Sequence, residues 1–202
     1  MLTVQRTMIR LGITGGIGSG KSVVSQMLRA MDVPVYDSDE ESKRLTTTHK
    51  GIRAQLTELV GREVYADDGS LNRSVLASWL FSSEEHTLKV NSIIHPVVKE
   101  DFLSWVKKQE NAGYKACGIE SAILIEAGFL DVVEKVVVVT APLETRIERT
   151  MQRDHAARKS VLNRMARQMN EEEKMEKADY VIRNEVNTPL IPQVCHIITS
   201  LL

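Results

Sequence analysis

The chain has 202 residues, of which 43% are apolar and 26% charged, and its 26 basic and 27 acidic side chains leave a formal net charge of −1. These values fit one globular domain, or one domain carrying an insertion, and exclude a wholly disordered or collagen-like chain. The absence of a basic excess argues against a nucleic-acid partner. No apolar run reaches the roughly 18–20 residues of a membrane span, so we predict no membrane partner.

Residues 1–8 lack the long apolar stretch of a secretory signal, so we predict a cytoplasmic location. The two cysteines, Cys117 and Cys195, fall inside predicted elements, where we expect reduced and buried thiols. The oligomeric state has no signal in the sequence.

Apolar strands alternate with helical patterns along most of the chain. Strands are predicted at residues 9–14, 33–36, 115–120, 135–140 and 180–182, and helical patterns at residues 21–31, 97–110, 144–153, 160–169 and 190–201. Four consecutive valines make the fourth strand the clearest buried parallel strand. Strands separated by helices predict an α/β fold, with a parallel five-stranded sheet flanked by helices.

Residues 40–96 break this alternation. They carry mainly helical pattern, with a turn at residues 67–70 and no convincing central strand. We therefore predict a helical insertion between the second and third strands.

A glycine-rich motif follows the first strand and opens the first helix. Residues 15–22 read Gly-Gly-Ile-Gly-Ser-Gly-Lys-Ser, which matches G-x-x-x-x-G-K-[ST]. Glycines let successive N–H groups turn towards phosphate oxygens, and the helix N-terminus adds its positive dipole end. In this pattern Lys21 reaches the β- and γ-phosphates and the Ser22 hydroxyl ligates Mg²⁺. The motif predicts a nucleoside triphosphate site.

Two carboxylates follow the second strand directly, in the run Asp37-Ser38-Asp39. Ligands of a parallel α/β sheet lie beyond the carboxyl ends of the strands, so we expect both carboxylates beside the phosphate loop. One can accept the proton of an acceptor hydroxyl while the other helps to hold Mg²⁺. The alternative is that these side chains only cap the following helix.

Between residues 146 and 167 basic side chains outnumber acidic ones by seven to two. Arg146, Arg149 and Arg153 recur at helical spacing and share one face. Guanidinium groups on one face suit a triphosphate, so we predict a helical lid. A solvated helix face is the alternative.

Several motifs occur in order across nearly the whole chain. They are residues 14–22, 33–39, 68–73, Phe81, residues 94–96, 120–126, 149–154, Arg164, Gln168 and residues 178–184. This ordered set resembles the dephospho-coenzyme A kinase family, whereas the phosphate loop alone is shared with many families. The resemblance implies a P-loop kinase fold and ATP-dependent phosphorylation of the ribose 3′-hydroxyl of dephospho-CoA, the last step of coenzyme A synthesis.

The resemblance also implies three regions. A nucleotide-binding core takes residues 1–39, 97–143 and 170–202, a helical acceptor domain that binds the CoA precursor takes residues 40–96, and a lid takes residues 144–169.

Roles carry over residue by residue. Asp39 is the implied general base, assisted by Lys21, Arg146, Arg149 and Arg153. ATP is bound by Gly15, Gly16, Gly18, Ser19, Gly20, Lys21, Ser22, Val23 and Asn184, and Mg²⁺ by Ser22 and Asp37. The acceptor side comprises Asp37, Asp39, Arg73, His95 and Glu126. Two roles stay open, since His95 can instead be structural and Glu126 can order magnesium-bound water or only cap structure.

Two other functions share part of this pattern. A kinase for a nucleoside monophosphate or a sugar acid would use the same loop, but the helical insertion and the Ile94-His95-Pro96 block favour the CoA precursor. A nucleotide-dependent switch without turnover would need neither the aspartate pair nor the basic segment.

Overall fold

The computed structural model describes residues 8–201, and the chain divides into two compact units. One unit runs up to Asp37 and resumes at Trp105, and the other is Ser38–Ser104. Residues 1–7, where we predict no secretory signal, and residue 202 lie outside the described residues.

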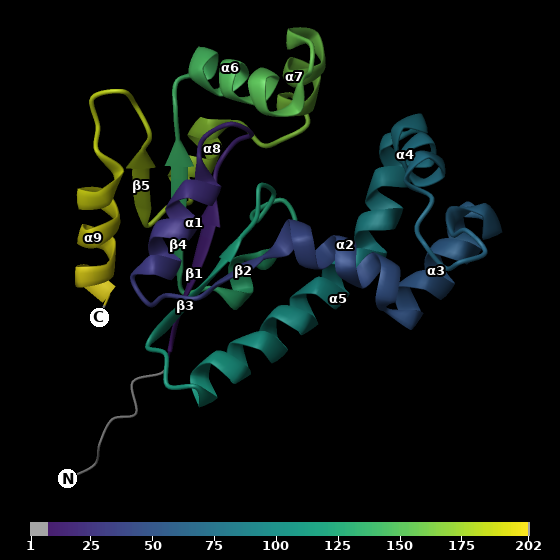
Figure 1. Cartoon of the computed structure of the whole chain (residues 1–202), viewed down its shortest axis with the longest axis horizontal. Helices are drawn as coiled ribbons and strands as arrows, with labels where there is room; N and C mark the ends of the chain where they lie inside the picture. The colour runs from purple at the N-terminus through teal and green to yellow at the C-terminus, as the bar shows by residue number, and fades with distance from the viewer. Residues whose placement is uncertain (1–7, 202) are drawn as a thin grey trace. The chain divides into compact units, whose positions relative to one another are not determined.

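The first unit is built on a five-stranded sheet in the order β2-β3-β1-β4-β5, with every pair parallel (Figure 1). The strands are β1 Ile9–Thr14, β2 Val35–Asp37, β3 Ala116–Glu120, β4 Lys135–Thr140 and β5 Tyr180–Arg183. The predicted α/β fold with five parallel strands is therefore confirmed. Strand β2 begins after Pro34, because proline has no N–H to give to the ladder.

The helices outside the insertion are α1 Lys21–Ala30, α6 Leu143–Asp154, α7 Arg158–Met165, α8 Glu171–Glu176 and α9 Leu190–Leu201, with a 3₁₀ turn η2 at Phe129–Val132. Of these elements, α1, α8, α9 and η2 contact strands of the sheet, whereas α6 contacts α7. One core cluster joins Val24 and Leu28 of α1 to Val194 and Ile197 of α9 and to inward side chains of the strands. The apolar positions Val24 and Leu28 of the predicted first helix thus pack on the sheet, whereas Val23 is exposed.

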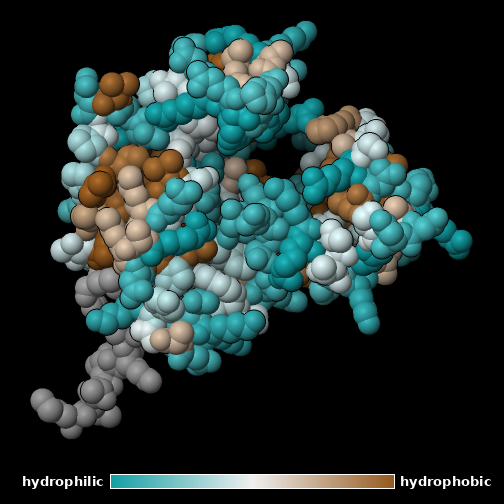
Figure 2. Space-filling model, in the orientation of Figure 1, coloured by the Kyte–Doolittle hydropathy of each residue, from teal (hydrophilic) through white to brown (hydrophobic). Residues whose placement is uncertain are grey.

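The two cysteines differ in exposure. Cys117 in β3 is buried as predicted, but Cys195 is exposed, and the expectation of a buried thiol there is wrong. On α9 the buried positions are Val194, Ile197 and Leu201, and Cys195 is turned about 100° around the helix axis from Val194. An apolar helix therefore leaves Cys195 at its surface. In Figure 2 apolar surface gathers over β5 and α9, where Val181 and Ile191 are also exposed.

The second unit is helical, as predicted for the insertion. It contains α2 Ser38–Thr48, α3 Lys50–Val60, the 3₁₀ turn η1 Arg62–Val64, α4 Arg73–Ser82 and the first part of α5 Glu84–Asn111. Its described residues form a single antiparallel bridge, between Tyr65 and Leu71, around the predicted turn at residues 67–70. Arg53 closes this turn by donating to the carbonyl of Gly69 (2.6 Å) while its guanidinium lies 4.1 Å from the Tyr65 ring centroid.

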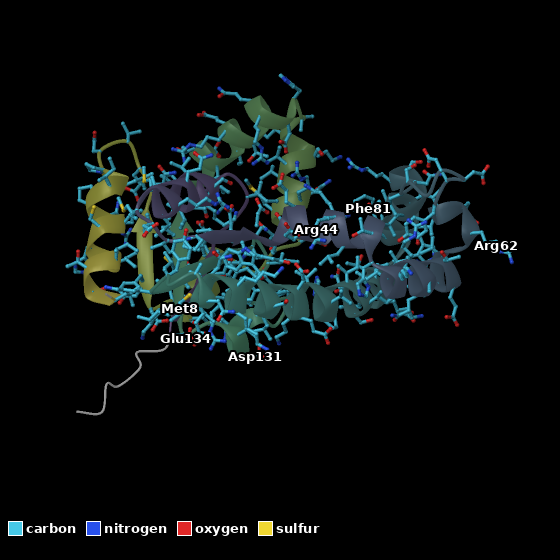
Figure 3. All side chains as sticks on the ribbon, turned by 60° about the horizontal axis from the view of Figure 1, so that its bottom comes forward. Met8, Arg44, Arg62, Phe81, Asp131 and Glu134 are labelled. Atoms are coloured by element: carbon cyan, nitrogen blue, oxygen red, sulfur yellow. The ribbon has the colours of Figure 1, made fainter. Side chains whose placement is uncertain are left out.

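Helix α5 runs through Pro96 without a break, whereas the sequence pattern suggests a helix that starts at residue 97. Proline removes the bond to the carbonyl of Ser92, which is tolerated here because both residues are exposed and water can satisfy that carbonyl. Figure 3 labels Arg44 on α2, Arg62 on η1 and Phe81 on α4, all in this unit.

Candidate active site

The carboxyl ends of the parallel strands carry most of the predicted site residues. The phosphate loop follows β1, while Asp37 ends β2, Glu120 ends β3 and Asn184 follows β5. Asp37 and Glu120 are paired in register on neighbouring strands. This edge is where an open α/β sheet binds its ligands.

The phosphate loop has the backbone that its glycines allow. Gly15, Gly18 and Gly20 have φ values of 151°, 79° and 97°, which other residues rarely adopt. Gly20 precedes the first turn of α1, so the unpaired N–H groups of that helix end open onto the loop. Lys21 folds back, and its Nζ donates to the carbonyl of Gly15 at 3.0 Å. The loop is thus a concave, positively polarised surface suited to phosphate.

Two oxygen-bearing side chains meet beside the start of α1, and a third belongs to the neighbouring strand. Ser22 Oγ donates to Glu120 Oε1 at 3.0 Å, and Asp37 is the register partner of Glu120. Hydroxyl and carboxylate oxygens are the ligands that Mg²⁺ prefers, and Mg²⁺ takes few protein ligands beside phosphates and water. This donor set fits a nucleotide-bound Mg²⁺. A self-sufficient metal centre does not occur in residues 8–201, where no three His, Cys, Asp or Glu side chains form a metal-binding group.

The guanidinium of Arg149 on α6 points at the phosphate loop. Its Nη1 lies 4.0 Å from the position that a Cβ on Gly20 would take. This nitrogen is buried and has no hydrogen-bond acceptor among residues 8–201. A buried N–H without an acceptor costs free energy. Because the guanidinium is positively charged, an anion such as a phosphate is the acceptor that suits this position best.

Arg146 and Asn184 also contact the loop, through its backbone. Arg146 Nε donates to the carbonyl of Ile17 at 3.0 Å, and its Nη1 pairs with Glu171 at 2.9 Å. Asn184 Nδ2 donates to the carbonyl of Ser19 at 2.8 Å, and Gly20 must be glycine because a Cβ would overlap this amide. Both side chains are therefore already occupied by protein groups.

Arg153 lies further along α6 and pairs with Asp154 at 2.7 Å. Asp154 also receives Arg164 of α7, and these two hydrogen bonds hold the pKa of its carboxyl well below the usual range. Figure 2 shows that α6 and α7 present mainly hydrophilic surface. The segment of α6 and α7 is rich in basic side chains, as predicted, and several of them form exposed ion pairs.

Glu126 accepts a hydrogen bond from the N–H of Met169 (2.9 Å) and an ion pair from Lys174 (3.2 Å). Lys174 itself is fully buried and donates to the carbonyl of Ala122 at 2.9 Å. These contacts attach the segment after α7 to the loop after β3.

Three further predicted residues lie in the second unit, whereas Val23 is exposed on α1 of the first. Asp39 is exposed in the first turn of α2, Arg73 is the exposed first residue of α4, and His95 is half-buried on α5. Burial lowers the pKa of His95, which favours its neutral form.

Three residues of this region carry no assigned role in the sequence reasoning. Glu120, the partner of Ser22, ends a predicted strand at the ligand-binding edge, and that position is the signal that points to it. Gln168 and Lys174 make contacts with residues 151 and 52 positions away in the sequence, and residue spacing does not predict such contacts.

Within residues 8–201 no helix is both long and apolar enough to cross a membrane.

Comparison with known proteins identifies the family. Residues 9–189 match the family model described as dephospho-CoA kinase. A dephospho-CoA kinase of Bacteroides fragilis is 51% identical over 197 residues, covering 96% of this chain and 93% of its own. A solved structure from Thermus thermophilus superposes with a TM-score of 0.82 at 30% identity, covering 96% of this chain and 98% of its own. A dephospho-CoA kinase from Campylobacter jejuni has the same fold, with a TM-score of 0.69 at 19% identity, covering 95% and 96%. This chain is an enzyme of the P-loop kinase fold and belongs to the dephospho-CoA kinase family.

Proposed function

We propose that this chain phosphorylates dephospho-CoA at the ribose 3′-hydroxyl with ATP as the phosphate donor, and that the residues described above carry out this reaction. One observation carries the residue-level proposal: Nη1 of Arg149 is buried without an acceptor among residues 8–201, beside a loop whose glycines have positive φ values. A triphosphate supplies the acceptor that this nitrogen lacks.

On the donor side, the N–H groups of residues 18–22 and the Lys21 ammonium bind the phosphates. Lys21 now donates to loop carbonyls, and it exchanges them for phosphate oxygens when ATP binds. Arg149 neutralises charge on the transferring phosphoryl group, with Arg153 beside it on the same helix. The amide of Asn184 keeps the loop in shape at the nucleotide end.

Mg²⁺ accompanies ATP in this proposal and supplies charge neutralisation on the phosphates. Ser22 and Asp37 would hold it, and Glu120 orients the Ser22 hydroxyl. The all-oxygen character of these three side chains supports the assignment.

On the acceptor side, Asp39 accepts the proton of the 3′-hydroxyl as the oxygen attacks the γ-phosphorus. Its support is the position two residues beyond the end of β2, in the first turn of α2, where its carboxylate is exposed. We assign Arg73 and His95 of the helical unit to the CoA precursor, His95 as a neutral hydrogen-bonding group. Glu126 contributes to acceptor binding indirectly, by holding the segment of Met169 and Lys174 in place.

The cytoplasmic location and the absence of a nucleic-acid partner stay predictions made from the sequence.

The test measures ADP release from ATP with and without dephospho-CoA, and maps the new phosphate on the product. We expect turnover that requires dephospho-CoA and product phosphate at the ribose 3′ position. Turnover with a nucleoside monophosphate or a sugar acid in its place would contradict the acceptor assignment. ATP binding without acceptor-stimulated ADP release would indicate the switch function instead.

A further inference from the structure

Both backbone polar groups of Ile17, in the middle of the phosphate loop, are held by side chains from the α6–α8 segment. The N–H of Ile17 donates to Gln168 Oε1 at 3.0 Å, and its carbonyl accepts from Arg146 Nε at 3.0 Å. Gln168 follows α7, whereas Arg146 belongs to α6. Two residues on opposite sides of α7 in the sequence thus fix one residue of the loop.

Each of these side chains is itself fixed at its other end. Arg146 is 8% exposed, and its Nη1 pairs with Glu171 Oε2 at 2.9 Å. Gln168 donates from Nε2 to the carbonyl of Ala122 at 3.3 Å, the same carbonyl that accepts from the buried Lys174. Rotation of Arg146 away from Ile17 would break its pair with Glu171, and rotation of Gln168 would remove the acceptor of the Ile17 N–H.

The loop backbone also packs directly on Arg146. A Cβ on Gly16 would overlap the Arg146 guanidinium, and a Cβ on Gly18 would overlap the Arg146 carbonyl and stand 2.7 Å from Thr150 Oγ1. Gly18 is therefore required by the approach of the α6 backbone, and Gly16 leaves room for the Arg146 guanidinium, independently of any phosphate.

We propose that Gln168 and Arg146 are positioning residues that hold the phosphate loop in its phosphate-binding shape before ATP arrives. This inference rests on the proposed function for the loop, and it gives Arg146 a task different from the charge neutralisation implied by the family resemblance. This guanidinium is buried, and two of its three nitrogens are already committed to the protein, Nε to a carbonyl and Nη1 to a carboxylate. Loss of either residue therefore acts first on ATP binding, because the loop must then be ordered at the expense of binding free energy.

Gln168 is tested by Gln168→Met, which keeps the length of the side chain and removes both hydrogen bonds, and by Gln168→Glu, which keeps an acceptor for Ile17. The exposed glutamine of α6, changed in Gln152→Met, is the matched control. Amide exchange of Ile17, measured by NMR on the protein without nucleotide, should accelerate about five-fold in Gln168→Met. It should stay within about two-fold of wild type in Gln168→Glu and in the control. The Kd for ATP should rise in parallel with the exchange rate, with the KM for dephospho-CoA unchanged.

Arg146 is tested by Arg146→Gln and Arg146→Met, both combined with Glu171→Gln so that no buried carboxylate is left alone. A glutamine Nε2 stands the same number of bonds from the backbone as the arginine Nε that donates to Ile17. We expect the glutamine variant to keep kcat within about three-fold of wild type and the methionine variant to raise the KM for ATP by about five-fold. An arginine that neutralises the transferring group would instead lower kcat by about 10³-fold in both variants.

Two results overturn the proposal. One is an unchanged Ile17 exchange rate in Gln168→Met, and the other is an equal, large loss of kcat in both Arg146 variants. The exchange measurement needs neither ATP nor an acceptor, so its failure is distinct from a failure of the proposed function. The latter would appear as absent dephospho-CoA-dependent turnover in the unmodified enzyme.

Discussion

The hydroxyl of Ser22 and the carboxylate of Glu120 are hydrogen-bonded at 3.0 Å, although 98 positions of sequence separate them. The contact joins the first turn of α1 to the end of β3, at the edge where Asp37 also lies. A carboxylate in this position fixes the direction of the serine lone pairs, as partners of metal ligands commonly do.

Glu120→Gln should therefore raise the Mg²⁺ concentration that gives half-maximal activity by about 10-fold, because an amide no longer orients the hydroxyl as a carboxylate does. The measurement is the initial rate against free Mg²⁺ at saturating ATP. Glu134→Gln is the control, since Glu134 (Figure 3) pairs with Arg10 of β1 away from this edge. An unchanged Mg²⁺ dependence in Glu120→Gln would remove Glu120 from the proposed metal environment.

Asp39→Asn should lower kcat by about 10²–10⁴-fold, because the amide cannot accept the proton of the acceptor hydroxyl. The Kd for ATP, measured by titration calorimetry, should stay unchanged. Glu40→Gln, at the neighbouring exposed carboxylate of α2, is the matched control and should turn over normally. Full turnover in Asp39→Asn would show that another group takes the proton.

Arg149→Met should lower kcat/KM for ATP by about 10³-fold, since the guanidinium provides a desolvated charge for the transferring phosphoryl group. Arg149→Lys should recover only part of this loss, because one ammonium cannot replace a planar fork. Arg158→Met serves as the control, since Arg158 forms an exposed ion pair with Glu144 at 2.7 Å. Wild-type kcat/KM in Arg149→Met would exclude a phosphate contact.

The two thiols should differ sharply in reactivity. Burial raises the pKa of the Cys117 thiol to about 12, so its thiolate is scarce at pH 8, whereas Cys195 is exposed. A disulfide reagent should titrate one thiol in the native protein and both of the chain's 2 cysteines after denaturation. The variant Cys195→Ser should show no fast native reaction. A fast reaction that persists in it would place Cys117 within reach of solvent.

His95 should make the folded protein less stable in mild acid. Burial lowers the pKa of His95 from its ordinary value of 6.5, so below about pH 6.5 the unfolded chain binds a proton that the folded chain does not. This destabilisation is absent at pH 8 and grows as the pH falls through the unfolded value, until the folded state is also protonated. Thermal unfolding of wild type and His95→Gln between pH 8 and pH 5 measures it. We expect the Tm of wild type to fall more steeply, and parallel curves would contradict the burial effect.

The strands of the sheet and the phosphate loop could be predicted from the sequence, because each is marked by residues close together along the chain. The valines of residues 136–139 and the glycines of the loop each mark their element without reference to distant residues. The burial of Arg146 could not be predicted, since its spacing with Arg149 and Arg153 is equally that of a free basic face. What distinguishes it is Glu171, which begins a helix that no periodic pattern marks. The exposure of Cys195 and the passage of α5 through Pro96 likewise depend on which side of a helix meets a neighbour.

Because Gly16 and Gly18 lie close to α6, the phosphate loop alone is not expected to bind nucleotide well when it is transferred to another protein. A different scaffold that received residues 15–22 alone would gain flexible glycines but lack the wall of Arg146 and Thr150 against which they lie. In such a protein the glycine loop would lose its conformational entropy on nucleotide binding, and this loss would weaken the binding. Transplantation of nucleotide binding from this chain therefore requires α6 to travel with the loop, although more than a hundred residues lie between them in the sequence.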